Sequence, residues 1–189
     1  MSFNESALEK SIIDLLKQQG ISHVRGDTIA RETSEVLLKD DLRGFLKTRY
    51  AAEGITDTEI DSIIRTLESK PASDLYDTNK AIMKMVSDGF LLKRDDRNEK
   101  DFLVQFIDYS NPDKNIYKIV NQLEIFGFEK RIPDAILYIN GLPLVVFEFK
   151  SAVREEATIH DAYIQLTVRY RRDIPELLKY NAPSLVELS

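Results

Sequence analysis

The sequence predicts a mixed α/β fold, in which a helical stretch near the N-terminus precedes a strand-rich core. Residues 26–97 carry apolar residues at helical spacing, whereas residues 98–189 contain most of the runs rich in β-branched and aromatic residues. A chain of 189 residues fits one domain with a substantial core. We therefore expect residues 1–189 to form a single domain, with a first core helix in 1–25, a helical subdomain in 26–97 and a sheet core in 98–189.

The N-terminal half is expected to be mostly helical. A first helix is predicted to end at Gly20, because glycine commonly follows a helix C-terminus. A later helix has apolar residues at i, i+3, i+4 and i+7, namely Ile60, Ile63, Ile64 and Leu67. The preceding Thr56-Asp-Thr-Glu59 is typical of a capping box at its start. Another helix is expected from about Ser73 to Asp88, before Gly89.

Strand-like sequence follows a charged segment, residues 93–101, which is expected to be a solvated loop. Residues 102–107 and 116–126 are rich in β-branched and aromatic residues and are predicted to form strands. Beyond them, a helix is expected from about Thr158 to Arg172, and Ser184–Leu188 is a candidate for a final strand.

Composition excludes several classes of protein and of site. The chain has no cysteine, which excludes a disulfide scaffold, a thiol nucleophile and a cysteine zinc site. It has neither an apolar stretch of membrane-spanning length nor the pattern of a signal peptide, so a cytoplasmic location is expected. The net charge of −6 argues against DNA binding by overall charge and predicts weak affinity of the isolated chain for DNA.

Residues 131–150 carry the most informative pattern. Two apolar runs flank Asn140-Gly141, which is a strong hairpin signal. The first run begins at Asp134, and the second ends with Glu148 and Lys150, which project to one face of a strand because they are two residues apart. Two carboxylates at a sheet edge suit Mg²⁺, and a lysine beside them could stabilise negative charge on a phosphate. The pattern favours phosphodiester hydrolysis; the alternative is a buried hairpin with incidental charges at its ends.

The register of this hairpin constrains the hypothesis. A strict two-residue turn would pair Ile139 with Leu142 and would place Asp134 opposite Phe147. Asp134 and Glu148 would then point to opposite faces, because a slip of one residue moves a side chain across the sheet. We therefore predict a loop of odd length, or a bulge, between Ile139 and Leu144.

At these residues the sequence resembles a known nuclease family. Asn121-Gln122, Arg131–Asp134, Asn140–Leu144 and Phe147–Ser151 are similar, in order, to the N-terminal nuclease region of the type I restriction enzyme R subunit, within the PD-(D/E)xK nuclease superfamily. The resemblance implies a restriction-endonuclease-like fold, with a central mixed sheet flanked by helices and a helical N-terminal insertion. It also implies Mg²⁺-dependent cleavage of double-stranded DNA, with Mn²⁺ as a possible substitute. Methyltransferase and specificity subunits are further implied as partners. The absence of an apolar stretch of membrane-spanning length separately predicts no membrane association.

The same resemblance implies that Asp134, Glu148 and Lys150 are catalytic, with Asp134 and Glu148 as metal ligands. In this family, cleavage is coupled to ATP-driven translocation by helicase domains. No phosphate-binding loop motif occurs in this sequence, so ATP would act only through domains absent from it. The chain is therefore expected to be a fragment of a longer protein.

Glu9 is a further candidate for a metal ligand. Nucleases of the resembled superfamily often carry a glutamate on the first helix, and Glu9 occupies that place in this sequence. The alternative is structural: Ser6-Ala-Leu-Glu9 also fits a capping box, in which Glu9 would accept a hydrogen bond from a backbone N–H.

The helix after the hairpin supplies the remaining candidates. The family shows Gln-x-x-x-Tyr here, whereas this chain has one residue more between Gln165 and Tyr170. On an α-helix these two residues would lie about 140° apart and would not share a face. Tyr170 belongs to an apolar stripe and is predicted to be core. Gln165 is kept as a catalytic candidate, and Arg169 and Arg172 on the polar side are predicted to bind DNA.

Two other functions remain open. In one, the domain has no catalytic role and docks the motor and the methyltransferase core, with Thr33–Asp88 as the contact surface. In the other, it is a structural domain without a site. Carboxylates of Asp134 and Glu148 too far apart to share one ion would favour the second of these.

Overall fold

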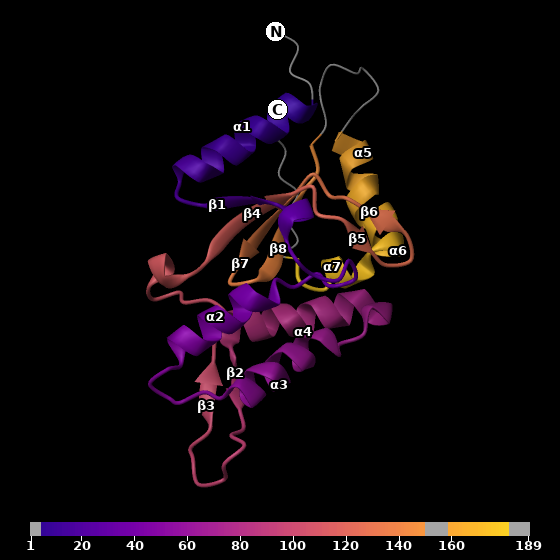
Figure 1. Cartoon of the computed structure of the whole chain (residues 1–189). Coiled ribbons are helices and arrows are strands. Elements are labelled where there is room, and N and C mark those ends of the chain that lie inside the picture. The colour runs from indigo at the N-terminus through magenta and orange to yellow at the C-terminus, as the bar shows by residue number, and fades with distance from the viewer. Residues whose placement is uncertain (1–4, 150–158, 182–189) are drawn as a thin grey trace.

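A four-stranded mixed sheet forms the centre of the domain, as a computed structural model describes it for residues 5–149 and 159–181. The strand order is β1-β4-β7-β8. β1 (Ser22–Arg25) runs parallel to β4 (Tyr117–Asn121), while β7 (Ala135–Ile139) is antiparallel to both β4 and β8 (Leu142–Phe147). The predicted mixed sheet flanked by helices is therefore confirmed (Figure 1).

The two faces of this sheet belong to different cores. On one face, Ile119 and Ala135 pack under helix α1 (Glu5–Gln18) in a small cluster. On the other face, Ile136 and Tyr138 belong to a large core shared with the helical layer. Figure 1 shows α1 on one side of the sheet and α2, α3 and α4 on the other. Successive residues of a strand point to opposite faces of the sheet. Along β7, Ala135 therefore faces α1, whereas Ile136 and Tyr138 face the large core.

The helical layer consists of α2 (Lys39–Arg49), α3 (Asp57–Glu68) and α4 (Leu75–Asp88). The capping box predicted for α3 is present: the Thr56 hydroxyl accepts from the Glu59 N–H at 3.2 Å, and the Glu59 carboxylate accepts from the Thr56 N–H at 2.9 Å. At the end of α4, Gly89 has φ of +76°, a backbone conformation that glycine adopts more readily than other residues.

Two small hairpins extend the fold. β2 (Phe90–Leu92) pairs with β3 (Phe102–Val104), and the charged loop predicted at 93–101 joins them beyond the helical layer (Figure 1). β5 (Ile125–Phe126) pairs with β6 (Lys130–Arg131) beside the C-terminal helices. The short 3-10 helices are η1 (Gly26–Thr28), η2 (Ala72–Asp74) and η3 (Pro112–Lys114).

The helix predicted at 158–172 is present but is not a uniform α-helix. It consists of α5 (Ile159–Ile164), the π-helix η4 (Gln165–Tyr170) and α6 (Arg171–Asp173), followed by α7 (Pro175–Leu178). The candidate strand Ser184–Leu188 lies outside the described residues. No helix in the described part of the chain is both long and apolar enough to span a membrane.

Candidate active site

The hairpin between β7 and β8 contains the bulge that the sequence predicts. Asn140 and Gly141 have φ of 51° and 82°, which is the left-handed conformation that a tight hairpin turn requires. Ile139 pairs with Leu142, yet Ala135 pairs with Phe147, because the register shifts by one residue between Leu137 and Tyr138. The extra residue on β8 is Leu144.

This bulge decides how the two candidate carboxylates face. One step beyond the Ala135–Phe147 pair, the shifted register places Asp134 opposite Glu148 rather than opposite Phe147. Residues directly opposite one another on antiparallel strands project to the same face. Asp134 and Glu148 therefore lie on one face, at one end of the hairpin, as the hypothesis requires.

Asp134 is fixed by the strand opposite it. Its Oδ2 accepts a hydrogen bond from the backbone N–H of Phe149 at 2.6 Å. This bond spans the open end of the hairpin, where the ladder of β7 and β8 has already ended. The half-buried Asp134 carboxylate therefore has a defined orientation next to Glu148. Lys150, the third predicted catalytic residue, lies outside the described residues.

Glu148 is held from the opposite side by Tyr170. The Tyr170 hydroxyl donates a hydrogen bond to Glu148 Oε2 at 2.7 Å, and Gln165 Nε2 donates to the same hydroxyl at 3.2 Å. Burial, and then the negative charges of Glu148 and Asp134, raise the pKa of Tyr170 above its ordinary value. Tyr170 therefore stays protonated and remains a donor. It also belongs to the large core, as predicted.

The expectation that Gln165 and Tyr170 do not share a face is wrong. That expectation assumed α-helical geometry, but residues 165–170 form a π-helix, whose hydrogen bonds run from i to i+5. The hydrogen-bond spacing is five residues there instead of four, which brings the Gln165 and Tyr170 side chains to the same side of the helix. The π-helix thus accommodates the residue by which this chain exceeds the Gln-x-x-x-Tyr spacing. π-helical turns are rare and are frequent at functional sites.

Glu9 lies on the side of the sheet that α1 covers. Ser6 is inside α1 and does not cap it, which removes the capping-box alternative. The Glu9 Oε1 atom instead accepts a hydrogen bond from Asn121 Nδ2 at 2.7 Å, and Asn121 Oδ1 is 2.9 Å from His23 Nε2. Asn121 pairs with Ala135, the residue next to Asp134.

Asn121 is two residues from Ile119 on β4, so its side chain projects to the face of the sheet that α1 covers. Glu148 instead contacts Tyr170, which belongs to the large core on the other side. Among the described residues, no three His, Asp or Glu side chains gather in a group that could hold a metal. Metal ligation by Glu9 therefore stays a prediction. Sequence reasoning missed the Asn121–His23 contact, although Asn121 belonged to the quoted resemblance.

The two arginines predicted to bind DNA are both exposed. Arg169 is in η4, and Arg172 follows in α6. Arg172 Nε is 2.6 Å from Asp173 Oδ1, and Arg131 Nε donates to Asp173 Oδ2 at 2.7 Å. These hydrogen bonds, the one from Arg172 foremost, lower the pKa of the buried Asp173 to about 2. No signal in the sequence marked Asp173 as the residue that joins Arg131 to the helix.

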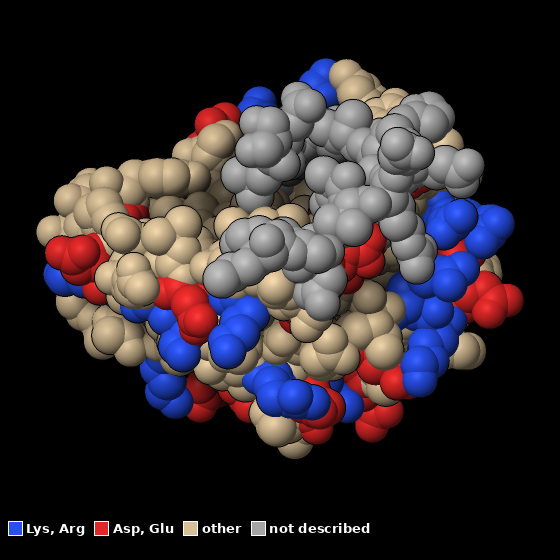
Figure 2. Space-filling view, turned by 90° about the horizontal axis from the view of Figure 1, so that it is seen from above, with Lys and Arg blue, Asp and Glu red and all other residues tan. Residues whose placement is uncertain are grey.

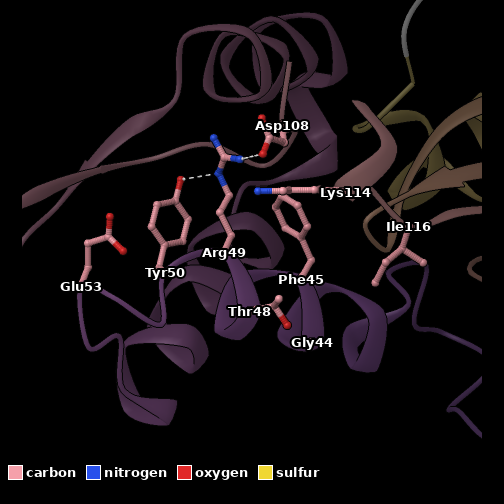
Figure 3. Close-up of a pocket in the computed structure, with 9 residues that line it drawn as sticks. All are labelled: Gly44, Phe45, Thr48, Arg49, Tyr50, Glu53, Asp108, Lys114 and Ile116. Atoms are coloured by element: carbon pink, nitrogen blue, oxygen red, sulfur yellow. Dashed lines mark hydrogen bonds and ion pairs between the residues drawn. The ribbon is translucent and has the colours of Figure 1, made fainter. Parts of the chain in front are cut away.

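A separate hollow of about 750 Å³ lies between α2 and the segment around Asp108 (Figure 3). Arg49 reaches across it, forming an ion pair with Asp108 and donating a hydrogen bond to the Tyr50 hydroxyl at 3.3 Å. The charge of Arg49 is thus already compensated. None of the candidate site residues lines this hollow, so it is distinct from the candidate site.

Residues 2–188 match the sequence model of a family described as "Type I restriction enzyme R protein N terminus". The chain belongs to this family. Its relatives include the type I restriction enzyme HindI endonuclease subunit of Haemophilus influenzae, which is 28% identical over 193 residues, 97% of this chain and 18% of the relative.

Two further relatives have similar coverage. The putative type I restriction enzyme MjaIXP endonuclease subunit of Methanocaldococcus jannaschii is 29% identical over 92% of this chain and 17% of its own length. The type I restriction enzyme SauCOLORF180P endonuclease subunit of Staphylococcus aureus is 31% identical over 89% of this chain and 17% of its own length. This member of the R-protein N-terminal family therefore spans less than a fifth of the relatives it matches.

Proposed function

We propose that this chain is the metal-dependent endonuclease domain of a type I restriction enzyme and that it hydrolyses DNA phosphodiester bonds. The observation that carries the proposal is the β8 bulge, which places Asp134 and Glu148 opposite one another on the same face of the sheet, at one end of the hairpin. Membership of a family of restriction-enzyme R proteins supports a nuclease role in general. A bulge in the hairpin that carries the two carboxylates at its open end is the kind of irregularity that re-aims side chains at active sites.

The donor set fits a hard divalent cation. Mg²⁺ is usually held by one or two carboxylates, with water and phosphate oxygens completing its coordination. Asp134 and Glu148 would supply the carboxylates, and Mn²⁺ could substitute. When bound, such an ion would stabilise charge on a phosphate oxygen and lower the pKa of a coordinated water. Glu9 remains a candidate for a further ligand.

The chain's own residues would prepare this site in two ways. The Phe149 N–H orients Asp134, and the Tyr170 hydroxyl, supported by Gln165, orients Glu148. Such outer partners fix the direction of metal-binding carboxylates and raise metal affinity. We further propose that Lys150 stabilises negative charge on the phosphate during hydrolysis.

The proposed setting is a larger assembly in the cytoplasm. Double-stranded DNA would be the substrate, contacted by Arg169 and Arg172 beside the site. Methyltransferase and specificity subunits would be protein partners, and ATP would act through motor domains absent from this chain. The printed names of the relatives describe endonuclease subunits of type I restriction enzymes, which supports this setting.

One observation favours the second candidate function, docking without catalysis. Tyr76 on α4 is 74% exposed, within the predicted contact surface Thr33–Asp88. Large exposed aromatic residues are enriched at protein interfaces. A docking module would keep this surface but would need no metal, so metal binding separates the two functions.

Calorimetric titration with Mn²⁺ tests the proposal directly. The wild-type chain is compared with Asp134→Ala and Glu148→Ala, and with Asp113→Ala in the exposed turn η3 as a matched acidic control. We expect the control to bind as the wild type does. Each site variant loses a ligand and should therefore lose more affinity than the roughly 10- to 100-fold that removal of an outer partner costs. Equal Mn²⁺ affinity in folded wild-type and site variants would overturn the metal site.

A second variant separates metal binding from chemistry. Lys150→Ala should fold and bind Mn²⁺ but should abolish DNA cleavage by the complete enzyme. Loss of folding in this variant would mean that Lys150 is structural. A wild-type chain that neither binds Mn²⁺ nor supports cleavage in the assembly would favour docking.

A further inference from the structure

The β5–β6 hairpin presents two phenylalanines to solvent next to the candidate site. Phe128, at the tip, is 79% exposed, and Phe126, paired with Lys130, is 54% exposed. Exposed single apolar residues are common on proteins, but two aromatic rings within three residues of one tight hairpin are a specific feature. The question is what holds the hairpin in place and what its rings face.

The hairpin is fixed to the end of the helix that carries Tyr170. The Phe128 N–H donates a hydrogen bond to the Asp173 carbonyl at 2.8 Å. Gly127 lies so close to that carbonyl that a side chain at this position would collide with it. Arg131, at the end of β6, is hydrogen bonded to the Asp173 carboxylate at 2.7 Å. The exposed rings are therefore held by an ordered turn.

The same hairpin leads directly into the site. Asp134 follows Phe128 by six residues, so their Cα atoms are at most about 20 Å apart. From the other side, Asp173 follows Tyr170 by three residues. Both connections place the rings within a few nucleotides of the carboxylates along a bound strand.

The hairpin and the helix to which it is bonded carry several arginines on a protein that is acidic overall. The net charge of the chain is −6. Three of the basic residues of the hairpin and α6 are paired with carboxylates: Lys130 with Glu124, and Arg131 and Arg172 with Asp173. Arg169 and Arg171, on the helix to which the hairpin is bonded, are exposed. Figure 2 shows Lys and Arg side chains gathered at its right-hand edge, the side on which Figure 1 places α6 and this hairpin.

We propose that Phe128, assisted by Phe126, is a stacking site for unpaired bases of a DNA strand at the candidate active site. The proposal rests on the proposed nuclease function and adds to it a preference for locally unpaired DNA. Every base presents a π-face, so an aromatic side chain can hold a strand whatever its sequence, while nearby cations follow the phosphates. The exposed Arg169 and Arg171, on the helix to which the hairpin is bonded, suit the phosphates of a nucleic acid strand.

Fluorescence anisotropy of labelled DNA tests this site without the metal. The chain is titrated in EDTA against a fully paired duplex and against the same duplex with a central mismatched bubble. The variants are Phe128→Ala, Phe128→Trp, and Tyr76→Ala as a control with an equally exposed ring on α4. In a parallel experiment, 5-iodouracil in the bubble is used for photocrosslinking, and the crosslinked residue is mapped.

We expect Phe128→Ala to bind the bubble about ten-fold more weakly, with little change on the paired duplex. Phe128→Trp should keep the preference for the bubble, Tyr76→Ala should behave as the wild type, and the crosslink should map to Phe128 or Phe126. Equal bubble affinity of the wild type and Phe128→Ala, or no binding of the bubble by the wild type, would overturn the stacking site.

The outcome is separable from that of the nuclease proposal. Mn²⁺ binding that depends on Asp134 and Glu148, together with unchanged bubble affinity in Phe128→Ala, would leave the nuclease standing and remove the stacking site. The exposed rings would then be explained by contact with a protein. The reverse result, stacking without Mn²⁺ binding, would support a strand-binding surface and count against the nuclease.

Discussion

Gln165 and Tyr170 are five residues apart and yet hydrogen bonded, with Gln165 Nε2 donating to the Tyr170 hydroxyl at 3.2 Å. The contact exists because the helix is π-helical over these residues. It links a residue on the half-buried side of the helix to a buried hydroxyl that itself binds Glu148. The π-helix therefore accommodates the extra residue within this segment, and Gln165 still contacts Tyr170, which binds Glu148.

Removing one residue from this segment should convert it into an α-helix. Deleting the exposed Val168 would leave a Gln-x-x-x-Tyr spacing, in which the two side chains again share a face. We expect the deletion variant to fold cooperatively and to keep Mn²⁺ binding, as measured by thermal unfolding and calorimetry. A matched deletion of Thr66, inside the regular helix α3, should be strongly destabilising because it would rotate Leu67 out of the core. An equal fall in unfolding temperature for the two deletion variants would contradict this account of the π-helix.

Substituting Tyr170 by Phe removes the donor to Glu148 and leaves the ring in the core. We expect Mn²⁺ affinity, and cleavage by the complete enzyme, to fall about 10- to 100-fold, as for other partners of metal-binding carboxylates. Calorimetry and a cleavage assay measure the two effects.

Tyr138→Phe is the matched control for this substitution. Tyr138 is also fully buried, and its hydroxyl donates to the Val36 carbonyl at 3.0 Å, away from the carboxylates. The free energy of unfolding of Tyr138→Phe should be about 1 kcal/mol lower than that of the wild type, and its Mn²⁺ affinity should be unchanged. A similar loss of Mn²⁺ affinity in both variants would mean that Tyr170 acts only through stability.

The hairpin could be predicted in detail because its determinants are local. Asn140-Gly141 fixes the turn, and the requirement that Asp134 and Glu148 share a face then requires one extra residue, which the structure shows as Leu144. The capping box of α3 and the glycine after α4 were predictable for the same reason, since each depends on neighbours within a few residues.

Features that depend on distant residues were not predictable. β1 forms by pairing with β4, more than ninety residues later, and its four residues carry no strand pattern that distinguishes them from a loop. One ion pair of Asp173 is with Arg131, which is 42 positions away. The π-helix was missed because apolar periodicity was read with α-helical geometry, which a single extra residue shifts by about 100°.

The ion pairs of Asp173 predict a specific acid sensitivity. The pKa of Asp173 is lowered from an ordinary 3.8 to about 2, chiefly by the hydrogen bond from Arg172. Because the folded state holds the charged form, this stabilisation is complete above about pH 5 and is lost as pH falls from about 4 to 2. Asp173→Asn should therefore unfold at a lower temperature than the wild type at pH 7, and the difference should shrink over that range.

Thermal unfolding as a function of pH measures this effect, and Asp113→Asn, in the exposed turn η3, is its control. The control should differ little from the wild type at any pH in the range. If the difference in unfolding temperature between Asp173→Asn and the wild type stayed constant down to pH 2, packing, and not the charge of Asp173, would account for the loss of stability.

Lys179 stabilises the junction between α3 and the C-terminal helices. Its side chain is fully buried, and its Nζ donates hydrogen bonds to the carbonyls of Glu68 at 3.1 Å and Lys70 at 2.7 Å, and to the Glu176 carboxylate at 2.6 Å. Lys179→Met keeps most of the volume but leaves these acceptors without their donor. The free energy of unfolding in urea should fall by roughly 1–3 kcal/mol. Lys84→Met, on the exposed side of α4, should change it by less than about 0.5 kcal/mol. Equal effects of the two substitutions would show that the Lys179 ammonium contributes nothing specific, and the end of α3 would then have to be held by packing alone.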